Sequence, residues 1–277
     1  MSYTLSNLLR DGLSEIRDLR YGKATAAGST TSLTDALRPT SENALSFIGG
    51  TLIVLRDAGG AGAAPEGEFS PVSNYASGVF TLADALSADI ASGDRYGIST
   101  NQFVHEELLE LANEAIQRFQ IAVMDTSITT AVDQTEYVLP AALKAESLLR
   151  VEYQGNLDQV SNNRWVTLHN ADVSFTPAGE AAAISLPYLP SGRTVRISYL
   201  GTHPTINAFD DPIAEVIHRE LARASFVERL ANRNVEKVKN VARPFTIGYD
   251  KAAKNYEDAL LRHPIYIPQR RSKLMII

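Results

Sequence analysis

The segment that comes closest to a catalytic motif is residues 105–109, which read His-Glu-Glu-Leu-Leu. On a helix, the HExxH pattern places two imidazoles one turn apart on a zinc ion, with the glutamate as general base. Leu109 occupies the position of the second histidine, so the motif is incomplete. The sequence therefore predicts that His105 and Glu106 are ordinary residues on the polar side of a helix.

The glycine-rich segment at residues 57–67 is the second segment that could bind a ligand, because glycine-rich loops can hold phosphate groups. It lacks the GK[ST] ending of a phosphate-binding loop, and Pro65 stands where GxGxxG from Gly60 needs its third glycine. This composition predicts a flexible loop. No GxSxG elbow occurs. Four further histidines are scattered along the chain without metal-ligand spacing: His169, His203, His218 and His263.

Asp210 and Asp211 form a pair of carboxylates that could act as general acid and general base. Asp211 also precedes Pro212, and this order favours a helix start, because the carboxylate accepts unpaired N–H groups and proline suits the first helical position. Helix capping is a sufficient reason for these two aspartates, and a helix is predicted to start at Asp211 and Pro212. We accordingly predict that the chain is not an enzyme and has no catalytic residue, cofactor or metal.

Composition is typical of a folded protein, with 44% hydrophobic and 21% charged residues. The absence of cysteine excludes disulfides, thiolate nucleophiles and cysteine-ligated metals. Apolar runs are too short to span a membrane, and the start does not resemble a secretory signal, so synthesis and folding are expected in the cytoplasm. Residues 213–277 carry a net charge of +6 against −12 for the rest. A basic end indicates either docking to an acidic surface or phosphate backbone, or simply a solvated helical face.

Hydrophobic periodicity predicts helices near residues 5–16, from about 101, from 211 and over 247–261. Gly22 is interpreted as the stop of the first helix. Short β-like runs separated by glycine and proline fill the two intervals between these helices. In the second interval, the alternation at residues 194–199 predicts a half-buried strand. The predicted fold class is α+β, with a helical core of about four helices and inserted antiparallel β-modules. The predicted parts are a helical core in residues 1–22 and 101–126, continued in 207–262, a β-module in 23–100, a second β-rich insertion in 127–206, and an extended tail in 263–277.

Two stretches resemble structural proteins of tailed bacteriophages. Residues 24–35 (ATAAGSTTSLTD), Gly-Gly-Thr-Leu at 49–52 and Gly-Asp-Arg-Tyr at 93–96 are similar to a β-module of virion proteins. Residues 108–233 resemble phage neck proteins, with a helix ending near NEAIQRF, the strand DQTEYVLP at 133–140, a β insertion and an Asp211-Pro212 helix. The chain is therefore similar to the head-to-tail adaptor, or connector, family.

This resemblance implies a virion structural protein, assembled in the host cytoplasm. It implies a homo-oligomeric ring of about twelve copies, seated at the neck between the portal protein and the tail or nozzle proteins. Genomic DNA would pass through its lumen with only non-specific contact, and an acidic body suits such passage. The alternatives are another tail, baseplate or head-completion subunit, a small glycan hydrolase with paired carboxylates, or a nucleic-acid-binding module that uses the basic end.

The C-terminal segment is predicted to dock into a neighbouring ring, in the first instance the portal. Pro264 and Pro268 block helix propagation, so the backbone between them should be extended. Apolar side chains exposed there would cost about 25 cal/mol per Å², which favours a partner groove, although folding back onto the same subunit is the alternative. Arginine and lysine would pair with acidic groups of the partner. The predicted docking residues are Ile265, Tyr266, Ile267, Arg270, Arg271, Lys273, Leu274, Met275, Ile276 and Ile277.

Overall fold

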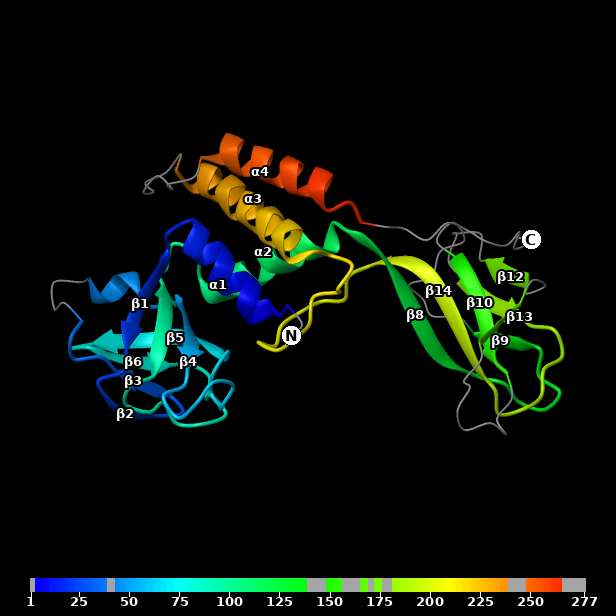
Figure 1. Cartoon of the computed structure of the whole chain (residues 1–277), viewed down its shortest axis with the longest axis horizontal. Coiled ribbons are helices and arrows are strands. Elements are labelled where there is room, and N and C mark those ends of the chain that lie inside the picture. The colour runs from blue at the N-terminus through cyan, green and yellow to red at the C-terminus, as the bar shows by residue number, and fades with distance from the viewer. Residues whose placement is uncertain are drawn as a thin grey trace. The chain divides into compact units, whose positions relative to one another are not determined.

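The structure of the chain is a computed structural model (Figure 1), and it folds as two compact units. The first unit combines Met1–Arg118 with Pro204–Pro264, and the second is built on Phe119–His203. The first unit is therefore discontinuous in sequence. The residues that the structure describes are 3–38, 43–138, 148–155, 165–168, 172–175, 181–238 and 248–265.

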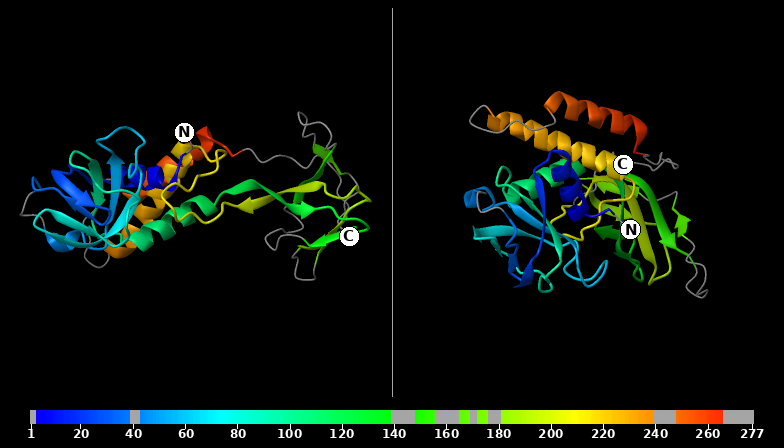
Figure 2. Two further views of the ribbon diagram at one scale, coloured as in Figure 1. Left: turned by 90° about the horizontal axis from the view of Figure 1, so that it is seen from below. Right: turned by 60° about the vertical axis from the view of Figure 1, so that its left-hand side comes forward.

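The helices in the described residues all belong to the first unit. Helix α3 packs against each of the other three, and α4 runs alongside it in both figures (Figures 1 and 2). None of these described helices is both long and apolar enough to span a membrane. The periodicity at residues 5–16 is confirmed, because Leu5, Leu8 and Leu9 are fully buried. The helices are α1 (Leu5–Glu15), α2 (His105–Gln117), α3 (Arg219–Val238) and α4 (Tyr249–Arg262).

A seven-stranded antiparallel sheet makes up the rest of the first unit, in the order β1-β7-β4-β5-β6-β3-β2. The aromatic rings of Phe47, Phe80 and Tyr96 lie at its centre, and all three side chains are fully buried. The strands are β1 (Leu19–Lys23), β2 (Ala26–Ser29), β3 (Ser32–Thr34), β4 (Thr51–Arg56), β5 (Phe69–Ala76), β6 (Val79–Leu82) and β7 (Arg95–Ser99), with a short 3-10 helix, η1 (Ala44–Ser46), before β4.

Gly22 is part of strand β1 and does not end a helix, so its predicted role was wrong. Helix α1 ends at Glu15, and the chain turns at Arg17, whose φ is 61°. A Cβ atom on Gly22 would lie 2.4 Å from the ring of Tyr96. The Tyr96 hydroxyl donates to the Asp35 carboxylate at 2.7 Å. The glycine is thus needed because this buried ring and its hydrogen bond occupy the space above β1.

The second unit contains two further antiparallel sheets. One has four strands in the order β11-β10-β14-β8, and the other has three in the order β12-β13-β9. Val151, Ile184 and Ile197 are fully buried in their shared core. The predicted strand at 194–199 is confirmed within β14. The strands are β8 (Gln120–Thr129), β9 (Glu136–Val138), β10 (Leu148–Gln154), β11 (Trp165–Thr167), β12 (Asp172–Phe175), β13 (Ala181–Ser185) and β14 (Thr194–Thr202).

The predicted fold class, α+β with a helical core and inserted antiparallel β-modules, was wrong. The described residues form sheets of seven, four and three strands, and the chain is mainly β. The sheets do not depend on a helical core, because buried apolar clusters lie within the sheets of each unit. Segments expected to be helical also join them. Residues 19–22 belong to β1, and residues 120–126 form the first part of β8.

The buried carboxyl of Asp18, in the turn between α1 and β1, should make the stability of the folded chain depend on pH. Asp18 is 7% exposed, one carboxylate oxygen accepts from the Thr100 hydroxyl at 2.6 Å, and the other has no hydrogen-bond partner among the described residues. Burial raises its pKa from 3.8 to about 6. The folded state therefore binds a proton that the unfolded state releases, so the contribution of Asp18 to stability falls as the pH rises from about 4 to about 6.

The expected size of this effect is about 3 kcal/mol, which corresponds to the shift of the pKa of Asp18 between the two states. Urea titrations of the full chain at a series of pH values would measure it. Asp18→Asn should remove this part of the slope between pH 4 and 6, whereas Asp89→Asn, a change at an exposed carboxyl, should leave the slope intact. An unchanged slope in Asp18→Asn would contradict the assignment.

Candidate functional site

His218, the residue directly before α3, organises the N-terminus of that helix. Its carbonyl oxygen accepts a helical hydrogen bond from the N–H of Ala222 at 3.0 Å. Its ring nitrogen Nδ1 accepts from the backbone N–H of Glu220 at 3.3 Å. The first N–H groups of a helix have no partner within the helix, and the imidazole here supplies one, as a Ser or Asp side chain commonly does. Because Nδ1 is the acceptor, the neutral ring carries its proton on Nε2.

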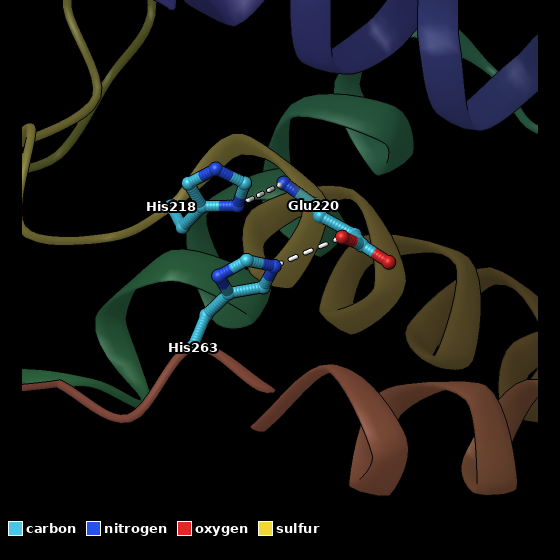
Figure 3. A group of neighbouring side chains, drawn as sticks. All are labelled: His218, Glu220 and His263. Atoms are coloured by element: carbon cyan, nitrogen blue, oxygen red, sulfur yellow. Dashed lines mark hydrogen bonds and ion pairs between the residues drawn. The ribbon is translucent and has the colours of Figure 1, made fainter. Parts of the chain in front are cut away.

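His263 ends helix α4 beside the start of α3. Its backbone N–H donates to the carbonyl of Ala259 at 2.9 Å, and Pro264 then prevents the helix from continuing. The Nε2 atom of His263 lies 2.9 Å from Oε2 of Glu220. The rings of His218 and His263 stack with their centroids 3.7 Å apart and their planes inclined by 19° (Figure 3). Two helix ends that are distant in sequence thus place three ionisable side chains together.

The electrostatics of these side chains favour a neutral histidine beside an ionised carboxylate. The hydrogen bond with His263, together with the charge of Arg262, lowers the pKa of Glu220. Arg262 reaches the other carboxylate oxygen, with Nη1 at 2.5 Å from Oε1. Burial, and then the proximity of His263, lower the pKa of His218. At neutral pH, therefore, Glu220 is a carboxylate and the imidazole of His218 is uncharged.

We call His218, Glu220 and His263 the α3–α4 histidine cluster. One ligand atom from each residue lies within 4.8 Å of the other two. The sequence analysis missed this cluster, since Glu220 and His263 are 43 positions apart. The only sequence signal is a His-x-Glu triplet before one helix and a histidine at the proline-terminated end of the next. Neighbouring antiparallel helices would bring these two positions together.

His105 is buried, so its predicted place on the polar side of a helix was wrong. It is 7% exposed, and its Nδ1 lies 2.9 Å from the Thr51 hydroxyl oxygen of β4. Its ring lies beside Phe69, with centroids 5.4 Å apart. Burial lowers the pKa of His105. The side chain therefore fastens the start of α2 to the seven-stranded sheet.

The helix predicted from Asp211 and Pro212 begins later, at Arg219. The Asp211 carboxylate accepts backbone hydrogen bonds, but in a turn and not at the start of a helix. Its Oδ2 accepts from the N–H groups of Asn207 and Ala208 at 2.6 and 2.7 Å. The backbone of Asp211 in turn accepts from the N–H of Leu5 at 3.0 Å. The aspartate thus holds the turn that meets the start of α1.

Carboxylates also line a small cavity between α2 and α3, which bears on the glycan hydrolase alternative. Glu107, Glu110 and Glu114 project from one face of α2 towards arginines of α3. Glu107 is ion-paired with Arg233, with Oε1 and Nε 2.8 Å apart. This carboxylate is matched by an arginine, and the contact joins the two helices.

The predicted docking tail falls almost entirely outside the described residues. Of its members only Ile265 is described, and that side chain is half-buried. Residues 266–277 lie beyond the described part of the chain, and their role as a docking segment remains a prediction.

No protein-family model matches the sequence, and a search of curated proteins finds no match. The function of the chain is therefore inferred from its own residues and geometry.

Proposed function

We propose that the chain is a structural protein of a tailed-phage particle. In this proposal it forms a ring at the neck, joins the portal protein to the tail or nozzle proteins, and lines the passage for DNA. Its resemblance to neck proteins supports this role. The basic C-terminal part and the expected docking tail support attachment to a neighbouring ring. The proposal requires, in addition, a surface through which one copy contacts the next.

Strand β8 is the observation that carries the proposal. It is the outer strand of the four-stranded sheet and, within the described residues, it pairs only with β14. An outer strand presents unpaired N–H and C=O groups, which are a template for another chain. At ten residues, β8 is the longest strand among those described. A contact of this edge with a different surface of the next copy is head-to-tail, and such contacts form a ring when the rotation between copies closes.

The side chains of β8 indicate which part of the edge is available. Met124 is 63% exposed, an uncommon environment for a large apolar side chain on an outer strand. Further along, the Asp125 carboxylate accepts from the backbone N–H of Ser127 at 2.9 Å and from its hydroxyl at 2.6 Å. This local bond occupies an N–H that an added strand would need. We therefore propose that the contact with the next copy lies at residues 120–124.

Assembly of the full chain tests this surface. Met124→Lys should leave the chain folded and reduce ring formation by at least about tenfold, because it puts a charge at the apolar contact. Leu37→Lys, at a side chain that is 86% exposed in the first unit, is the matched control and should assemble normally. Native mass spectrometry and electron microscopy would count the copies, with portal protein present because portal contact can supply part of the stabilisation.

The position of the labelled protein in the assembled particle tests the proposed function directly. The labelled copies should together form a closed ring at the neck. A single copy, an open filament or a label at the baseplate would contradict the proposal. Deletion of residues 269–277 should leave a soluble, folded subunit that fails to join the particle. Unfolding of the truncated chain, or its normal incorporation, would contradict the docking role of the tail.

A further inference from the structure

We propose that the α3–α4 histidine cluster is a binding site for a divalent late transition metal ion of the Zn²⁺ class. The ligands are the imidazoles of His218 and His263 and the carboxylate of Glu220, with water completing the coordination. This proposal stands independently of the proposed role in a phage particle. It follows from the donor types, their separation and the contacts that orient them.

The donor types select the metal. Two imidazole nitrogens and one carboxylate oxygen suit Zn²⁺ and its neighbours, whereas Mg²⁺ and Ca²⁺ prefer oxygen donors throughout. With bonds of about 2.0–2.1 Å to a tetrahedral ion, ligand atoms lie roughly 3.3 Å apart. The Nε2 atom of His263 and Oε2 of Glu220 are already 2.9 Å apart, and all three ligand atoms lie within 4.8 Å of one another. The two imidazoles are stacked in the absence of an ion, so one ring must turn out of the stack for both nitrogen lone pairs to point at the same ion.

The protonation states favour binding. Metal ligands must be neutral imidazole and ionised carboxylate. The carboxylate of Glu220 is ion-paired with Arg262, and Nδ1 of His218 accepts a hydrogen bond, as an ionised carboxylate and a neutral imidazole do. The ion would take the place of the hydrogen now shared by His263 and Glu220. The ring proton of His263 would then reside on Nδ1.

A contact outside the ligand set orients the carboxylate of Glu220. Arg262 binds Oε1 of Glu220. Such a contact outside the ligand set fixes ligand orientation in metal sites. The other oxygen, Oε2, is directed at His263 (Figure 3). His218 would bind through Nδ1, which exchanges its hydrogen bond from the backbone N–H of Glu220 for the ion, while Nε2 keeps its proton and the ring stays neutral. The positive charge of Arg262 opposes a cation, which limits the affinity.

A metal here would join the start of α3 to the end of α4. Those helices pack against each other, and Glu220 and His263, which are 43 positions apart, are joined by a hydrogen bond; the metal would replace that bond with coordination bonds to both residues. Because Pro264 follows His263 directly, the ion would also set the point where the last segment of the chain begins.

Titration of the untagged, EDTA-treated full chain with ZnCl₂ in a calorimeter tests the proposal. We expect one ion per chain and a rise in Tm when Zn²⁺ is in excess, since a ligand that binds only the folded state stabilises it. Co²⁺ should give visible absorption bands of a nitrogen- and oxygen-ligated ion of low coordination number. The absence of one-to-one binding of both ions would overturn the proposal.

Variants separate these ligands from adventitious surface binding. His218→Asn retains a side chain that caps the helix but removes the imidazole, and His263→Ala removes the other ring. Each should weaken binding by more than about 100-fold, beyond the 10–100-fold typical of losing an outer contact. Glu257→Gln, at an exposed carboxylate of α4, should bind as the parent does. Parent-like binding by either histidine variant would also overturn the proposal, and circular dichroism of each variant verifies its fold.

Discussion

Gly12→Val is expected to lower the free energy of unfolding of the chain by about 3 kcal/mol, at the upper end of the range for overpacked cores. Gly12 lies on the buried face of α1. A Cβ atom there would lie 2.4 Å from Cδ1 of Phe226. Phe226 belongs to α3 and its side chain is fully buried, and a close-packed core resists displacement of such a ring. The contact between α1 and α3 therefore depends on the absence of a side chain at this position.

The measurement is urea denaturation of the parent and variant chains, followed by circular dichroism. Ser14→Val, two positions further along the same helix and exposed, is the control for the helix propensity of valine. It should cost less than about 1 kcal/mol. A cost for Gly12→Val no larger than for this control would contradict the packing argument.

A double substitution sharpens the test. Phe226→Ala alone should cost about 3–5 kcal/mol, because it leaves a cavity in the core. In the double variant the valine at position 12 would fill part of that cavity, so the combined cost should be smaller than the sum of the single costs. Additive costs would show that Gly12 and Phe226 are not in energetic contact.

Glu152→Ala is expected to destabilise the second unit by about 2–3 kcal/mol. The Glu152 side chain is 1% exposed, and its two oxygens are ion-paired with Arg150 and Arg196. The Nε atom of Arg196 donates to Oε2 at 2.8 Å. Removal of one partner of a buried pair costs about 3–5 kcal/mol. The arginines are 42% and 23% exposed, so water relieves part of that cost.

The loss should be visible as a lower urea midpoint for the second unit. Glu136→Ala, an exposed glutamate on β9, is the matched control and should change stability by less than about 0.5 kcal/mol. Arg196 also lies over the ring of Trp165, with 4.3 Å from its Cζ to the ring centroid. Fluorescence of Trp165 therefore reports directly on this site. An unchanged midpoint in Glu152→Ala would contradict a stabilising role for the ion pairs.

The elements that the sequence predicted correctly are those held by local hydrogen bonds and one-sided burial. Leucines spaced by three and four positions predicted α1, and the same periodicity predicted α2. Alternation at residues 194–199 predicted a strand within β14. Glycines predicted the loop at 57–67, where Gly60 and Gly62 have positive φ. In each case a helix turn or a strand face depends on residues only a few positions apart.

Only the tertiary structure decided the neighbours of each strand and the residues of the candidate site. Strand β1 pairs with β7, joining Leu19 to Ser99, so residues 19–22 belong to a sheet where the sequence had predicted the helical core. Gly22 was misinterpreted for the same reason, because the Tyr96 ring above it comes from that distant strand. His218 and His263 meet because two helices pack side by side. Such contacts depend on which surfaces bury each other after chain closure, and no local spacing encodes that choice.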